Sequence, residues 1–211
     1  MISELFDNPS IFNKIRNMLI GGKHKFNIEA YSAINPSLNE TILELGCGTG
    51  ELSEFVILNS DYLGLDNSQR FLNKARLKYP NKNFINMDVK DILSLQKEFN
   101  KTIIVNFLHH FEDREVISIL NNVKSITKNK VIIIDAIRPI NKISNLLVRL
   151  DRGDYIRTAE DQLNLIGLIF KIEHTKLFKS GLYTFLVLIC SKKGTKNIKE
   201  KEVFWNNETG F

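Results

Sequence analysis

Short apolar runs alternate with stretches of helical character along most of the chain. Two of the helical stretches, over residues 68–79 and 112–126, place apolar residues three and four positions apart, as the buried face of a helix requires. Strands that alternate with helices predict an α/β protein with a parallel sheet and right-handed crossovers. The predicted strands cover residues 41–45, 62–65, 84–87, 102–107 and 131–134, and a further helix is expected over residues 51–59.

The pattern changes at both ends of the chain. Residues 169–178 and 182–189 are extended runs joined by Lys179-Ser180-Gly181, and so short a link favours a hairpin over a helical crossover. We therefore expect the sheet to end with an antiparallel strand. Residues 5–35 have an amphipathic helical pattern, which predicts a helical cap over one end of the sheet.

The composition is typical of a globular protein and excludes several classes. Of 211 residues, 43% are hydrophobic and 25% are charged, which excludes a mostly disordered chain. The longest apolar run, residues 182–190, is far shorter than the roughly 20 residues that cross a bilayer, and the first residues lack the pattern of a signal peptide. Cys47 and Cys190 cannot form a disulfide framework and lack zinc-ligand spacing, so we expect a protein of the reducing cytoplasm.

Positive charge collects at the end of the chain. The formal net charge is +5, and five lysines fall within the last 20 residues. Two interpretations stay open, a solvated terminus and a tail that contacts nucleic acid. These lysines are Lys192, Lys193, Lys196, Lys199 and Lys201.

A glycine-rich loop follows the first predicted strand. Gly46, Gly48 and Gly50 occupy alternate positions between that strand and the next helical stretch. Glycines let a ligand approach the backbone closely, and a helix start adds unpaired N–H donors. The spacing differs from the Gly-x-Gly-x-x-Gly pattern of dinucleotide-binding enzymes.

Polar residues also follow the next three strands. Asp66 ends the second strand, where a carboxylate can accept hydrogen bonds from ribose hydroxyls. Asp88 follows the third strand and could accept from the amine of an adenine, and Asn106 ends the fourth. Because ligands bind at the carboxyl ends of parallel strands, these residues predict one nucleoside site.

The motifs together resemble those of class I S-adenosylmethionine-dependent methyltransferases. Residues 44–50, Glu-Leu-Gly-Cys-Gly-Thr-Gly, resemble the first motif, and residues 63–68 are similar to the second, ribose-binding motif. The resemblance implies a Rossmann-like, doubly wound sheet of seven strands, mostly parallel with an antiparallel last strand. It extends to the adenine site at residues 86–89, the fourth-strand motif at 106–111 and the fifth strand at 131–135.

The resemblance also implies a cofactor and the residues that hold it. S-adenosylmethionine, with S-adenosylhomocysteine as its product, would contact the backbone of the glycine loop through its methionine part. Asp66 would hold the ribose, Asn67 would flank the adenine, and Asp88 with the Val89 amide would read the adenine edge. Glu44 would brace the loop, and Cys47 is either a packing residue or a reactive thiol. The implied cofactor-binding residues are Glu44, Gly46, Cys47, Gly48, Asp66, Asn67, Asp88, Val89 and Asn106.

Two histidines are candidate general bases. Alignment of the reactants can supply about 7–11 kcal/mol, whereas a base adds roughly 10²- to 10⁴-fold, so alignment is the larger effect. His109 and His110 lie on the loop after the fourth strand, and alternation of side chains lets one of them face the pocket. The resemblance favours His110, and a structural role for both is the alternative. No partner residue with ligand spacing lies nearby, so no metal is expected.

A second group of charged residues lies where this family carries the lid over the methyl acceptor. Guanidinium groups suit carboxylate or phosphate ligands, and the alternatives are an ion-pair cluster within the loop and a contact to the carboxylate of the cofactor. The arginines Arg149, Arg152 and Arg157 alternate with Asp151, Asp154 and Tyr155. We take Arg152, Arg157 and Tyr155 as candidate acceptor-binding residues.

We therefore expect a single methyltransferase domain over residues 1–211. It comprises a helical cap (1–38), an α/β core (39–191) and a basic tail (192–211). The predicted acceptor is a small molecule because residues 150–157 and the Asn-Pro pair at Asn8 are similar to a bacterial small-molecule subgroup. Two alternatives stay open. One is a nucleic-acid methyltransferase, which the basic tail suggests although the sequence has no base-flipping motif. The other is a protein that binds the cofactor without turnover. We expect no membrane association, and a monomer or a weak homodimer.

Overall fold

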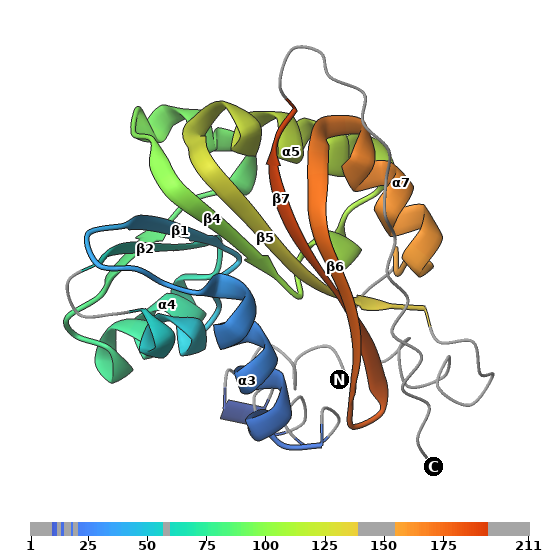
Figure 1. Ribbon diagram of the computed structural model, residues 1–211. Coiled ribbons are helices and arrows are strands. Elements are labelled where there is room, and N and C mark those ends of the chain that lie inside the picture. The colour runs from blue at the N-terminus through green and yellow to red at the C-terminus, as the bar shows by residue number, and fades with distance from the viewer. Residues whose placement is uncertain are drawn as a thin grey trace.

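Seven strands form one mixed sheet in the computed structural model (Figure 1). Their order across the sheet is β3-β2-β1-β4-β5-β7-β6. The first five strands are parallel, and β7 runs antiparallel to both β5 and β6, which confirms the predicted fold class. The structure describes residues 10, 11, 14, 18, 21–56, 60–138 and 155–193.

The predicted strands and the terminal hairpin are all present. The fourth strand ends two residues earlier than expected, so that Asn106 lies just beyond it. The strands are β1 (Thr41–Leu45), β2 (Asp61–Asp66), β3 (Asn83–Asn86), β4 (Phe99–Val105), β5 (Thr127–Ile137), β6 (Phe170–Ser180) and β7 (Tyr183–Lys192). The helices are α3 (Lys23–Ile34), α4 (Gln69–Lys78), α5 (Asp113–Ile126) and α7 (Ala159–Ile169), with 3₁₀ helices η1 (Glu51–Phe55), η2 (Val89–Leu95) and η3 (Leu108–His110).

Two helices differ from the expectation. The helix predicted over residues 51–59 is the short η1, in which the Ser53 hydroxyl donates to Gly50 O at 2.6 Å and tightens the turn. The sequence analysis did not predict α7. Its signal was Thr158, whose hydroxyl oxygen accepts the Asp161 N–H at 3.1 Å and caps the helix.

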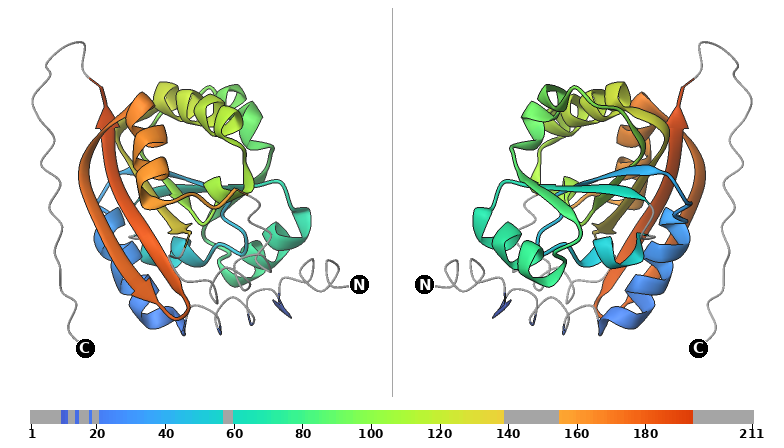
Figure 2. Two further views of the ribbon diagram at one scale, coloured as in Figure 1. Left: turned by 90° about the vertical axis from the view of Figure 1, so that its right-hand side faces the viewer. Right: turned by 90° about the vertical axis from the view of Figure 1, so that its left-hand side faces the viewer.

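Side chains that alternate along the strands fill two apolar layers. Figure 1 and Figure 2 show α5 and α7 on one face of the sheet and α3 and α4 on the other. The layer beneath α5 and α7 includes Leu43, Leu45, Leu65, Ile104, Ile133, Leu186 and Leu188. The opposite layer includes Ile42, Tyr62, Ile103, Ile132, Ile134, Phe185 and Val187.

The described part of the predicted N-terminal cap is α3. Its Phe26 ring lies 5.0 Å from the Phe185 ring and 6.0 Å from the Phe178 ring, between centroids. Through these contacts α3 covers a face of the sheet rather than one end of it. Residues 1–9 of the cap and residues 194–211 of the basic tail lie outside the described residues.

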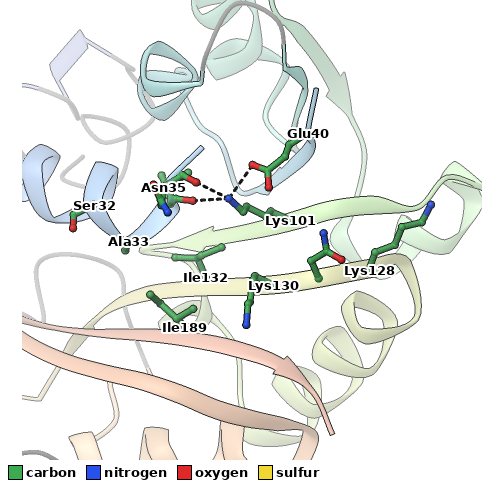
Figure 3. Close-up of a pocket in the computed structure, with 11 residues that line it drawn as sticks. Ser32, Ala33, Asn35, Glu40, Lys101, Lys128, Lys130, Ile132 and Ile189 are labelled. Carbon is green, nitrogen blue, oxygen red and sulfur yellow. Dashed lines mark hydrogen bonds and ion pairs between the residues drawn. The ribbon is translucent and has the colours of Figure 1, made fainter. Parts of the chain in front are cut away.

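A buried lysine ties α3 to the sheet. Lys101 of β4 donates from Nζ to Asn35 O at 2.6 Å and Ile34 O at 3.2 Å, and pairs with Glu40 Oε2 at 2.8 Å (Figure 3). The two carbonyls lie at the end of the helix, where the partial charge of the helix is negative. A cation at this position therefore satisfies both the helix end and the carboxylate.

Replacement of Lys101 by methionine should lower the free energy of unfolding by about 2–4 kcal/mol, because the Glu40 carboxylate and two carbonyls lose their donor. Urea unfolding measures this loss. The matched control is Lys128→Met, since Lys128 pairs with Glu98 at 3.2 Å in an exposed position, and its loss should stay below about 1 kcal/mol. Equal losses in the two variants would contradict the role of Lys101.

A cavity of about 700 Å³ lies beside Lys101, at the amino ends of β4 and β5 (Figure 3). Lys101, Lys128 and Lys130 line it, and each ammonium group already pairs with a glutamate: Glu40, Glu98 or Glu173. In Figure 3 the three ammonium groups point in different directions. The cavity therefore lacks converging charges, and the candidate site lies at the opposite edge of the sheet.

Candidate active site

The carboxyl ends of β1, β2, β3 and β4 meet at one edge of the sheet. Leu45 of β1 pairs with Leu65 of β2 and Ile104 of β4, and Asp66 pairs with Asn86 of β3. The structure therefore brings together the residues that the sequence placed at strand ends. They are Gly46, Asp66, Asp88 and Asn106.

The glycine loop has a backbone that other residues rarely adopt. Gly46, Gly48 and Gly50 have φ values of 66°, 53° and 73°, in the left-handed region. A Cβ atom on Gly46 would overlap the Phe107 ring, whereas one on Gly48 would meet no atom within 4 Å. Gly48 is thus the position at which a ligand has room to approach the backbone.

Asp66 connects the glycine loop to the start of α4. Its Oδ2 accepts the Gly48 N–H at 2.9 Å, and its Oδ1 accepts the Ser68 N–H at 2.8 Å. Burial raises the pKa of this carboxyl, and the two backbone hydrogen bonds offset part of that rise. Each carboxylate oxygen can accept a further hydrogen bond, so the group also suits ribose hydroxyls.

Cys47 is held within the loop. Its N–H donates to Leu65 O at 2.9 Å, and its carbonyl accepts the Gly50 N–H at 2.8 Å. Burial raises the pKa of the thiol far above its ordinary range, with the charges of Glu44 and Asp66 adding to the shift. These contacts favour the packing interpretation over a reactive thiol, because a reactive cysteine needs a lowered pKa.

A tyrosine that the sequence analysis did not single out holds Glu44. The Tyr62 hydroxyl donates to Glu44 Oε2 at 2.5 Å, and both side chains are buried. Gly64 makes room for this pair, because a Cβ there would lie 2.8 Å from the Tyr62 oxygen and 2.9 Å from Cys47 Sγ. Glu44 is therefore fixed directly beneath the loop, as a bracing residue would be.

Of the predicted adenine-site residues, Asn67 and Asp88 lie at the surface of the same edge. Asp88 is exposed, and its Oδ1 accepts the Lys90 N–H at 2.9 Å, which caps η2. Asn67 is exposed and Val89 is buried.

Asn106 turns the chain toward the two histidines. Its φ of 50° lies in the left-handed region, which asparagine tolerates better than most residues, and its N–H donates to Ile134 O at 2.8 Å. The chain then enters η3, where residues follow a period of three instead of the alternation of a strand.

His109 and His110 have different surroundings in the structure. His109 is buried, its Nδ1 is hydrogen-bonded to Asp135 Oδ1, and its N–H donates to Asp135 Oδ2 at 3.2 Å. His110 is exposed, with its ring 4.2 Å from that of His109 between centroids. The sequence favoured His110, whereas the structure places His109 against a carboxylate.

The sequence motifs include Asp135 only as the last residue of the fifth-strand motif, without a role. Because β4 and β5 pair Val105 with Ile134, Asp135 follows one position beyond this pair, beside Asn106. The sequence signal that could have identified Asp135 as a site residue is its acidic side chain, which directly follows four apolar strand residues.

The surroundings of Arg157 do not match its predicted role as an acceptor-binding residue. Its side chain is buried, and the Nε and Nη groups all donate to protein oxygens. This arrangement leaves no donor for an acceptor and supports the ion-pair alternative, with Asp113 as the partner. Tyr155 is 45% exposed, and Arg149, Asp151, Arg152 and Asp154 lie outside the described residues.

The described residues include neither a cluster of metal-ligating side chains nor a membrane-spanning helix. Within residues 21–56, 60–138 and 155–193, no group of three or more His, Cys, Asp or Glu side chains could hold a metal ion. Over the same part of the chain, no helix is long and apolar enough to cross a bilayer.

The strand order and the parallel strands followed by helices define a Rossmann-like fold, in which ligands bind at the carboxyl ends of the strands. A sequence profile described as "Methyltransferase domain" matches residues 42–130. Over this segment, which holds the glycine loop, Asp66, Asp88 and Asn106, the chain is therefore similar to methyltransferase domains.

One relative and several solved structures that this chain resembles are also named as methyltransferases. The 235L protein of Invertebrate iridescent virus 6, whose name places it provisionally among the methyltransferases, is 22% identical over 202 residues, covering 79% of this chain and 71% of that protein. Magnesium protoporphyrin IX methyltransferase from Synechocystis PCC 6803, with bound S-adenosylhomocysteine, has a TM-score of 0.68 at 17% identity and covers 89% of this chain and 97% of its own. N-methyltransferase NodS from Bradyrhizobium japonicum WM9 has a TM-score of 0.66 at 11% identity, with 82% and 97% covered.

Replacement of Tyr62 by phenylalanine should weaken S-adenosylmethionine binding about 5- to 10-fold, because the buried Glu44 carboxylate loses a donor worth roughly 1 kcal/mol. Isothermal titration calorimetry measures the dissociation constant. Tyr79→Phe is the matched control, since the Tyr79 hydroxyl donates to Glu54 at 3.3 Å in an exposed pair. A Tyr62 variant that binds as tightly as the control would contradict the bracing role.

Proposed function

We propose that this protein transfers a methyl group from S-adenosylmethionine to a small-molecule acceptor and that His109 takes the proton which the acceptor loses. One observation carries the proposal. The buried His109–Asp135 pair lies beside Asn106, at the same sheet edge as the glycine loop and Asp66. A proton acceptor and a nucleoside site therefore share one edge.

The residues present fit the cofactor. Gly48 faces open space, and Asp66 presents a carboxylate with remaining acceptor capacity. The glycine loop would meet the methionine part and Asp66 the ribose, while Asn67, Asp88 and Val89 would meet the adenine. When bound, S-adenosylmethionine supplies a methyl group on a positively charged sulfur, which is already electrophilic.

The chain's own contribution to catalysis is alignment and proton transfer. Asp135 accepts a hydrogen bond from Nδ1–H of His109, which fixes the tautomer and makes Nε2 the nitrogen that takes a proton. Such a base is worth roughly 10²- to 10⁴-fold in rate. An alcohol or phenol gains most from it, because its oxygen becomes a strong nucleophile only as the proton leaves.

The structural neighbours support a small acceptor. They include a magnesium protoporphyrin IX methyltransferase, a mitomycin 7-O-methyltransferase and the N-methyltransferase NodS. By analogy, we propose a small-molecule acceptor for this chain as well.

Two measurements test the proposed function. Purified protein should bind S-adenosylmethionine and S-adenosylhomocysteine in a calorimeter. With a radiolabelled methyl group and a cell extract, label should then appear in a small molecule that mass spectrometry identifies. Binding without transfer would identify a binding protein, label in tRNA or DNA would identify a nucleic-acid methyltransferase, and no binding would reject all three.

A further inference from the structure

Arg157 is buried beside the turn that carries the two histidines. Its Nη1 donates to Leu108 O at 3.2 Å, and its Nη2 donates to Phe111 O at 2.7 Å. These two carbonyls lie on either side of His109 and His110 in the chain. The planar guanidinium fork can hold both at once, which a single ammonium group cannot do.

Arg157 is itself fixed from two directions. Its Nε and Nη2 lie 2.8 Å and 2.7 Å from Asp113 Oδ1 in the first turn of α5. Its carbonyl accepts the N–H of Arg138, the residue directly after β5, at 2.7 Å. The guanidinium therefore has little freedom to move away from the turn.

The segment around Arg157 joins the two elements that carry the histidine–aspartate pair. Tyr155 N–H donates to His109 O at 3.1 Å, while Arg157 O holds the end of β5. His109 lies on η3 and Asp135 lies on β5. Residues 155–157 thus bridge η3 and β5 through backbone and side-chain hydrogen bonds together.

We propose that Arg157 is a positioning residue that holds His109 against Asp135. The effect of Arg157 on methyl transfer rests on the proposed function. Its effect on the hydrogen bond between His109 and Asp135 does not, because that hydrogen bond involves neither cofactor nor acceptor. A residue that served stability alone would affect unfolding without changing the histidine–aspartate hydrogen bond.

Proton NMR of the whole protein tests this without an acceptor. A buried imidazole N–H that is hydrogen-bonded to a carboxylate gives a far-downfield proton resonance, and loss of that signal in His109→Asn assigns it. In Arg157→Lys the resonance should broaden or disappear, while the dissociation constant for S-adenosylmethionine stays within about twofold. The control is Arg114→Lys, since Arg114 is an exposed neighbour of Asp113, and it should keep the resonance.

Asp113→Asn provides a second variant in case Arg157→Lys does not fold. Asp113 is 71% exposed, so this change removes the charge that fixes the guanidinium with little effect on the core, and it should weaken the resonance in part. An unchanged resonance in both variants would overturn the proposal, as would its absence from the unmodified protein. Equal loss of the resonance and of cofactor binding in both variants would show general unfolding instead of a positioning role and would overturn the proposal too. Failure of the proposed function shows itself separately, as absent binding or transfer in the unmodified protein.

Discussion

Replacement of His109 by asparagine is expected to lower kcat by roughly 10²- to 10⁴-fold, the usual contribution of a general base. Asparagine keeps an N–H that can donate to Asp135, so the buried carboxylate retains a partner. The variant lacks the ring nitrogen that takes the proton. Initial rates with the acceptor found in the labelled-methyl screen measure the effect.

Cofactor binding separates this catalytic effect from damage to the site. The dissociation constant for S-adenosylmethionine should change by no more than about twofold in His109→Asn. The matched control is His110→Asn, because His110 is exposed and adjacent. If the His110 variant lost most of its kcat while the His109 variant kept it, the base would be His110, as the sequence pattern favoured.

The second large effect is expected at Asp66. Replacement by asparagine should weaken S-adenosylmethionine binding about 10- to 150-fold, since a hydrogen bond to a charged group contributes roughly 1.5–3 kcal/mol. The amide also donates where the carboxylate accepts, which disturbs the contacts with Gly48 and Ser68. Calorimetric titration with S-adenosylmethionine gives the dissociation constant directly.

Asp61→Asn is the matched control for Asp66. Asp61 lies at the other end of β2 and pairs with Lys97 at 2.6 Å on the surface, so this variant should bind the cofactor normally. Similar losses in both variants would show that β2, and not the carboxylate, sets the affinity.

The pH dependence of cofactor binding follows from the same carboxylate. Burial raises the pKa of Asp66, and binding favours its ionised form. Affinity should therefore be retained at pH values well above this pKa and lost as the pH falls through it. The loss should begin at a higher pH than an ordinary aspartate would give, and should be absent from Asp66→Asn. A pH-independent affinity in the unmodified protein would contradict the role of the carboxylate.

Local patterns were enough to predict the sheet edge at which we propose that the cofactor binds. Strand runs, glycine positions and the residue after each strand are properties of short segments. Parallel pairing then brings those strand ends together without further information. For this reason Gly48, Asp66 and Asn106 could be placed from the sequence. Helix α7 also carries a local signal, the cap at Thr158, although it was not among the predicted elements.

The sequence by itself determined the order of the strands along the chain, the antiparallel finish and the glycine loop with its carboxylates, because short-range periodicity and turn chemistry encode them. Only the tertiary structure decided which histidine meets a carboxylate. The alternation argument did not apply there, because Asn106 turns the chain into a 3₁₀ helix. The partners of His109 and Arg157 lie 26 and 44 residues away in the chain, at Asp135 and Asp113. Such contacts depend on how β5, η3 and α5 pack, and no local pattern specifies that packing.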